Sequence, residues 1–107
     1  MKKNKRVLIL CKMSTWNCNT FWAQGGIASA VDETDIPAHI QDTLTAGVNY
    51  NDKVAVELLS KKSISTIKNL INAGMKFDLN ENGELAYTKE AAHSRNRILH
   101  AEDRKST

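Results

Sequence analysis

Apolar and polar residues are arranged along this chain in blocks that predict a mixed α/β fold. Residues 6–11 (RVLILC) form an almost continuous apolar run. Its length and its Val, Leu and Ile content are typical of a parallel strand covered on both faces. Residues 12–34 show no such pattern, and irregular stretches of that size in a compact domain are usually functional or disordered. The pattern therefore predicts a buried strand followed by a long loop.

Two helices are predicted after this loop. Asp35 can cap the first helix, Pro37 suits its first turn and Gly47 ends it. Its apolar positions follow i, i+4, i+8 spacing: Ile40, Leu44 and, at its end, Val48. The second helix begins after Asn51 or Asp52 and runs to Ala73. Its buried side is predicted to carry six apolar residues: Val54, Leu58, Leu59, Ile67, Leu70 and Ile71.

The last third of the chain predicts a β-hairpin and a polar tail. Asn82-Gly83 favours the positive backbone angles of a tight turn between strands at residues 75–79 and 84–88. The strands would be formed by apolar positions on either side of the turn: Phe77, Leu79, Leu85 and Tyr87. Residues 89–107 are polar and show no clear period beyond Ile98-Leu99. Without further context, the polar cluster at residues 88–101 indicates a surface loop.

Composition limits the class of protein. A chain of 107 residues with 41% hydrophobic and 25% charged residues is one ordinary globular domain. Its net charge of +3 comes largely from its two ends, which favours solvated termini over a nucleic-acid or membrane surface. No apolar run has the length of a signal peptide core or a membrane span, so we expect a cytoplasmic protein. Cys11 and Cys18 match no zinc or disulfide pattern, and Cys11 is best interpreted as a small buried hydrophobe.

Two segments concentrate residues that could perform chemistry. Residues 19–28 (NTFWAQGGIA) combine two aromatic side chains, polar donors and a glycine pair whose bare backbone can approach a flat ligand. Residues 88–101 hold one carboxylate, two imidazoles and two guanidinium groups: Glu90, His93, His100, Arg95 and Arg97. Such a set could bind an anionic substrate or RNA. The spacing of His93 and His100 matches no common metal site.

The order of these motifs resembles the L-aspartate oxidase family, within the succinate dehydrogenase and fumarate reductase flavoprotein group. The similarity runs through VLILCK, NTFWAQGGIASAVDETD, DTLTAG, GMKFD and HSRNRILHA, and so covers nearly the whole chain. The AQGGI motif is shared by the wider group, whereas the combination with DTLTAG and HSRNRILHA is more particular to L-aspartate oxidases.

The resemblance implies FAD-dependent oxidation of L-aspartate to iminoaspartate, for quinolinate and NAD synthesis, with oxygen or fumarate as electron acceptor. By the same resemblance, Glu90 orients the substrate through its amino group. The resemblance also assigns a set of residues that line the FAD: Lys12, Asn19, Thr20, Phe21, Trp22, Ala23, Gln24, Gly25 and Gly26.

The chain also departs from the family pattern. It lacks the G-x-G-x-x-G turn expected before residue 7, and it has Ala91-Ala92 where the family has Gly-Gly. The family's catalytic residues belong to a capping domain, which is not in this sequence. We therefore expect residues 1–107 to be a partial, Rossmann-like FAD-binding domain, inactive alone unless another chain complements it. The alternatives are a fragment of a succinate dehydrogenase or fumarate reductase type flavoprotein, and a small basic binding module without enzymatic activity.

Overall fold

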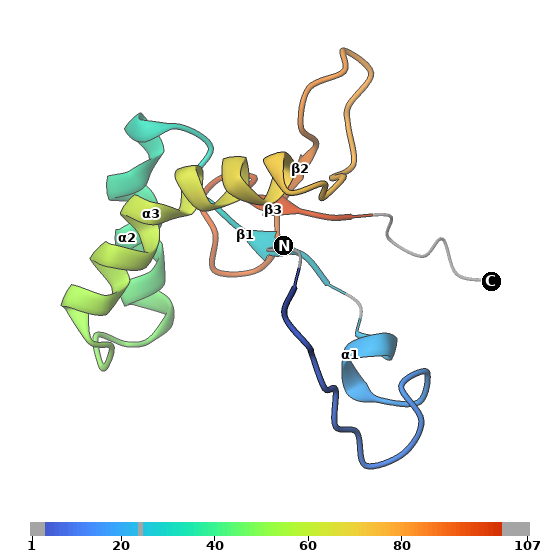
Figure 1. Cartoon of the computed structure of the whole chain (residues 1–107). Helices are drawn as coiled ribbons and strands as arrows, with labels where there is room; N and C mark the ends of the chain where they lie inside the picture. The colour runs from blue at the N-terminus through green and yellow to red at the C-terminus, as the bar shows by residue number, and fades with distance from the viewer. Residues whose placement is uncertain (1–3, 24, 102–107) are drawn as a thin grey trace.

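The computed structural model describes residues 4–23 and 25–101 (Figure 1). A body of two helices and a small sheet carries a separate N-terminal arm, residues 4–23, that includes a short helix. The radius of gyration is 16.3 Å, above the about 13 Å of a compact chain of this length. The elements in chain order are α1 (Asn19–Trp22), β1 (Ile27–Ala28), the 3₁₀ helix η1 (Glu33–Asp35), α2 (Ile36–Ala46), α3 (Lys53–Asn72), β2 (Tyr87–Thr88) and β3 (Ile98–Leu99).

Both predicted helices are present. The carboxylate of Asp52 caps α3 by accepting a hydrogen bond from the backbone N–H of Ala55 at 3.2 Å. The predicted capping role of Asp35 is wrong, because its side chain makes no cap hydrogen bond to α2. The carboxylate of Asp32, one turn earlier, accepts from the N–H of Asp35 at 3.0 Å and begins η1 instead.

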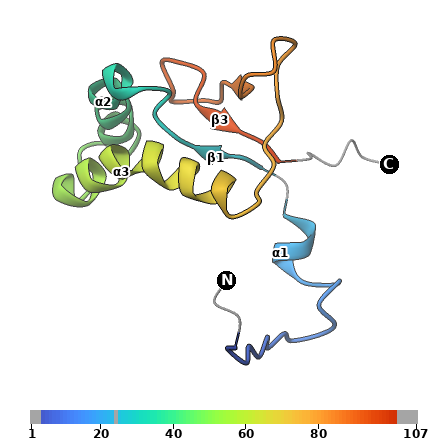
Figure 2. The same cartoon turned by 45° about the horizontal axis from the view of Figure 1, so that its top comes forward.

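The buried face of α3 agrees with the predicted one at Ile67 and at the half-buried Leu70, and it differs at the other four predicted positions. Val56, Ser60 and Ile67 are the buried residues of the helix, whereas Val54, Leu58, Leu59 and Ile71 are exposed. The sheet covers the C-terminal half of α3, and α2 lies beside its N-terminal half (Figure 2). The exposed Leu58 and Leu59 line an apolar hollow of about 540 Å³ together with Ile27 and Ala28.

The sheet has three short antiparallel strands in the order β1-β3-β2. Leu99 of β3 pairs with Ile27 on one side and Tyr87 on the other, and it is 1% exposed. It packs with Ile67 of α3 and with Phe77, and Leu70, Leu85 and Tyr87 surround this core. The prediction of a polar surface loop after residue 88 is therefore wrong for Ile98 and Leu99, which form the central strand.

The predicted hairpin is confirmed only around its turn. Gly83 has a φ of +79°, Leu79 and Leu85 form an isolated bridge, and the N–H of Asn80 donates to the carbonyl of Glu84 at 2.7 Å. Beyond this point Tyr87 and Thr88 pair with β3 and not with residues 75–77. The second strand of the predicted hairpin thus pairs with β3, which lies ten to twelve residues further along the chain.

The predicted strand at residues 6–11 does not form in this structure. Val7, Leu8, Ile9 and Leu10 are between 70% and 85% exposed. They belong to the arm that projects from the body (Figure 1). A parallel strand needs neighbouring strands for its hydrogen bonds and layers above and below for its side chains, and the described part of the chain places neither around these residues. Cys11, predicted to be buried, is exposed for the same reason.

Candidate functional site

The arm brings four of the predicted FAD-lining residues together. Lys12, Asn19, Thr20 and Phe21 line a hollow of about 650 Å³, whose apolar wall includes Ile9 and Leu10. The N–H of Trp22 donates to the carbonyl of Cys18 at 3.2 Å and closes the single turn of α1. An ammonium, a carboxamide and a hydroxyl thus surround an apolar-walled hollow, a combination common in ligand-binding pockets.

Trp22 and Ala23 are exposed and do not line this hollow. The Trp22 ring lies edge-on to the Phe21 ring, with a centroid distance of 5.4 Å. Gln24 lies outside the described residues. The structure therefore groups the residues before Trp22 and leaves Trp22 and Ala23 beside the hollow.

The two glycines of the motif have different surroundings. A Cβ added to Gly25, whose φ is +151°, would meet nothing within 4 Å, so its backbone is open to a flat molecule. A Cβ on Gly26 would collide with the side chain of Ile98 and lie 2.7 Å from the carbonyl oxygen of Leu99. Gly26 is needed for the close approach of the chain to β3, a packing role that the sequence analysis did not assign.

Glu90 lies in the segment that connects β2 to β3, which we call the Glu90 loop (residues 89–96). Its side chain is exposed and does not line the hollow on the arm. The N–H of His93 donates to the carbonyl of Glu90 at 3.3 Å, which forms a turn. Within that turn Ala92 has a φ of +69°, a left-handed conformation that glycine adopts without strain. The backbone thus retains a geometry suited to the family's glycine although the residue is alanine.

A buried ionic group that local sequence patterns did not predict connects Arg97, the residue after the Glu90 loop, to η1 and α2. The guanidinium of Arg97 donates from Nε to Asp35 Oδ2 and from Nη2 to Asp35 Oδ1, both at 2.7 Å. Its Nη1 donates to Asp42 Oδ2 at 2.6 Å. Arg97 and Asp35 are fully buried, and a two-pronged pair of this kind is among the strong charge-assisted contacts. We call Arg97, Asp35 and Asp42 the Arg97 cluster.

The Arg97 cluster shifts the ionisation of its members. Burial raises the pKa of Asp35, but the hydrogen bonds from Arg97 and Val31 and the nearby positive charges outweigh it, so the net shift is downward. Burial likewise opposes ionisation of Asp42, and the donors on Ser94 and Arg97 lower the pKa of Asp42 well below its usual range. Both carboxylates are therefore charged at neutral pH. Their two negative charges exceed the single positive charge of Arg97, and Arg95, 3.4 Å from Asp35, offsets the remainder.

His39 of α2 is buried beside the cluster. Its ring centroid lies 5.9 Å from that of His93, and burial, followed by the charges of Arg97 and His93, lowers the pKa of His39. A neutral imidazole in this position packs the Glu90 loop against α2.

Comparison with known proteins identifies the family to which this chain belongs. The sequence matches the family described as FAD binding domain over residues 1–107, which is the whole chain. The chain belongs to this FAD-binding domain family. Among the described residues of this FAD-binding domain, no helix is long and apolar enough to cross a membrane.

The relatives of this FAD-binding domain are much longer proteins. It is 48% identical to the L-aspartate oxidase of Clostridium acetobutylicum over 96% of this chain, which is 24% of that protein. It is 43% identical to the L-aspartate oxidase of Nostoc sp. over 96% of this chain and 18% of that protein. The chain therefore spans about a quarter or less of the length of these relatives.

Solved structures agree on the fold. A structure titled "Mycobacterium smegmatis Sdh1 in complex with UQ1" superposes with a TM-score of 0.74, at 25% identity, over 87% of this chain and 16% of that one. The apo form of the same complex gives the same TM-score at 27% identity. The architecture is thus that of the FAD-binding domain of the succinate dehydrogenase and fumarate reductase group, with helices and a small sheet.

Two features of the sequence weakly indicate the Arg97 cluster of this FAD-binding domain. Asp35 and Asp42 are seven residues apart, about two turns, so they share a helix face. Arg97 directly precedes the apolar pair Ile98-Leu99, where a charged residue needs a buried partner. Neither feature shows which acid meets which base, because the partners are 55 and 62 residues apart.

Proposed function

We propose that this chain is the part of an L-aspartate oxidase that lines FAD with its N-terminal arm and orients L-aspartate with Glu90. The observation that carries the proposal is the 48% identity to a protein of that name over 96% of the chain. The chain spans only 24% of that relative. The oxidation of L-aspartate to iminoaspartate, and oxygen or fumarate as acceptor, therefore belong to the proposal.

The residues of the arm fit a flavin. Lys12, Asn19 and Thr20 offer donors beside an apolar wall, and Gly25 presents open backbone. FAD, when bound, supplies the acceptor for a hydride from the substrate. Lys12 and the polar side chains would bind and orient it, against the apolar side chains of Ile9 and Leu10.

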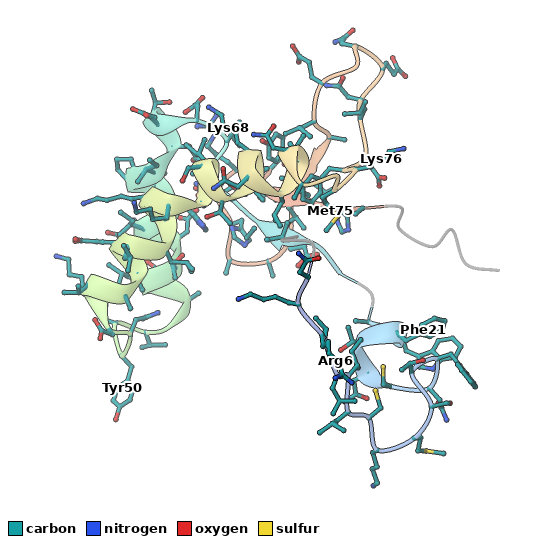
Figure 3. The ribbon with its side chains drawn as sticks, in the orientation of Figure 1. Arg6, Phe21, Tyr50, Lys68, Met75 and Lys76 are labelled. Carbon is teal, nitrogen blue, oxygen red and sulfur yellow. The ribbon has the colours of Figure 1, made fainter. Side chains whose placement is uncertain are left out.

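Titration of the purified chain with FAD tests the arm. Both tryptophans of the chain, Trp16 and Trp22, lie in the arm, so flavin binding there quenches their emission. We expect Phe21→Ala to weaken the quenching and Tyr50→Ala to leave it unchanged. Tyr50 is a matched aromatic control, 97% exposed and far from Phe21 (Figure 3). Equal titration curves for the two variants contradict the assignment of the arm.

The substrate assignment is tested by a graft. Residues 1–107 replace the matching segment of the Clostridium acetobutylicum relative, and oxidation of L-aspartate and of succinate is measured. A carboxylate at residue 90 pairs with the ammonium that succinate lacks, so we expect aspartate to be preferred and Glu90→Gln to raise the KM for aspartate. Glu81→Gln, in the exposed hairpin turn, is the control.

The same assay judges the second candidate. The similarity to Mycobacterium smegmatis Sdh1 favours a succinate-oxidising flavoprotein. Preference for succinate, with no effect of Glu90→Gln on its KM, supports that candidate and overturns the first.

We also infer that residues 7–10 become a strand of a Rossmann-like sheet when a complementing polypeptide is present. Their high exposure and unbroken apolar character support this. In the graft, their backbone amides should exchange with solvent far more slowly than in the 107-residue chain. Equally fast exchange in both contradicts the inference.

A further inference from the structure

The Glu90 loop is closed at its base by the sheet. The backbone N–H of Arg97, next to β3, donates to the carbonyl of Thr88 in β2 at 3.0 Å. The carbonyl of Arg97 accepts from the N–H of Ser29 at 3.0 Å, which ties the same residue to the chain after β1. The two ends of the loop are thus held, and the position of its tip depends on contacts made in between.

One oxygen atom makes the strongest of these contacts. Asp42 Oδ2 accepts from the backbone N–H of Ser94 at 2.8 Å and from the Ser94 hydroxyl at 2.6 Å. It also accepts from Arg97 Nη1 at 2.6 Å. A carboxylate oxygen with three short donors holds the loop by charge-assisted bonds.

The carboxylate is itself held in place. Asp42 lies inside α2, so its backbone moves only with the helix, and its side chain is 18% exposed. Arg97 also grips Asp35 at the start of the same helix. Ser94 is therefore fixed to a rigid element at a point four residues beyond Glu90, and the turn from Glu90 to His93 bridges most of that distance.

We propose that Asp42 is a positioning residue that sets the place of Glu90 by holding Ser94 against α2. A role of Asp42 in substrate recognition rests on the proposed function of Glu90. The effect of Asp42 on the position of the Glu90 loop does not. Asp42 touches neither substrate nor cofactor in this scheme and acts only through the loop.

Residue-resolved amide exchange and NMR spectra of the 107-residue chain test the proposal. Asp42→Asn removes the charge that strengthens the Ser94 bonds, so we expect the Ser94 amide to exchange roughly ten- to hundredfold faster. Ser94→Ala loosens the loop from the other side and stays informative if Asp42→Asn does not fold. Ser94→Thr keeps the hydroxyl and should restore wild-type behaviour. Glu57→Gln makes the same chemical change on α3 and is the matched control.

A second readout separates positioning from general stability. The amide resonance of Glu90 should move in Asp42→Asn and Ser94→Ala, but not in Ser94→Thr or Glu57→Gln. Unchanged Ser94 exchange, or an equal acceleration across α3, overturns the proposal. If these results hold while Glu90→Gln leaves the KM of the graft for L-aspartate unchanged, Asp42 still positions the loop and only the substrate role of Glu90 is refuted.

Discussion

Replacing Arg97 with alanine should destabilise this domain more than any other single truncation of a charged side chain in the Arg97 cluster. The substitution removes the three hydrogen bonds of the guanidinium to Asp35 and Asp42. It leaves the carboxylate of Asp35, which is 0% exposed, with the N–H of Val31 at 3.1 Å and the guanidinium of Arg95 at 3.4 Å. A buried charge that loses its main partner cannot be compensated by these weaker contacts.

The magnitude follows from burial. Breaking a buried ion pair by removing one partner costs about 3–5 kcal/mol. A chain of this length has a free energy of unfolding of roughly 5–15 kcal/mol. Arg97→Ala therefore removes a large share of the stability, and urea unfolding followed by circular dichroism of α2 and α3 measures it.

Two comparisons make the measurement decisive. Arg95 reaches the same carboxylate but is 47% exposed, so Arg95→Ala should cost no more than about 1 kcal/mol. Replacing both partners, Arg97→Met with Asp35→Leu, removes the two fully buried charges. Asp42 is 18% exposed and keeps its hydrogen bonds from Ser94, so the double replacement should cost less than Arg97→Ala alone. A loss below about 1 kcal/mol for Arg97→Ala, or a loss equal to that of Arg95→Ala, refutes the reasoning.

Three further predictions follow from the same structure. The pKa values of Asp35 and Asp42 are lowered on folding, so their stabilisation is present at neutral pH and is lost as the pH falls below about 4; urea midpoints should drop there, and Asp42→Asn should flatten the profile. Gly26→Ala places a methyl group against β3 and should cost about 1–3 kcal/mol by the same urea assay. Ala92→Gly relieves the strain of a φ of +69° and should increase the free energy of unfolding by up to about 1 kcal/mol, which raises the melting temperature. A lower melting temperature would contradict the inference that Ala92 is strained.

The helices were predictable because their signals are local. Asp52 before α3, Gly47 after α2 and the apolar spacing between them act within a few residues of the chain. The hairpin turn at Asn82-Gly83 is local in the same sense and is confirmed by the bridge between Leu79 and Leu85. Which face of α3 is buried was not predictable, because this depends on where α2 and the sheet lie.

The candidate site divides in the same way. The resemblance named Lys12 and residues 19–21, and the structure places these around one hollow. The assignment of Lys12, residues 19–26 and Glu90 to FAD and L-aspartate stays a prediction. The Arg97 cluster and the close approach of Gly26 to β3 were missed, because both depend on partners that are distant along the chain.

By itself the sequence determined the helices, the turn and, through its ordered motifs, the FAD-binding family. Only the tertiary structure decided that Ile98-Leu99 is the central strand, that Arg97 is buried between two aspartates, and that the apolar run at residues 7–10 has no strand beside it among the described residues. The physical reason is that caps, turns and periodicity are properties of neighbouring residues. Strand pairing and the burial of charge depend instead on groups that meet only when the chain folds.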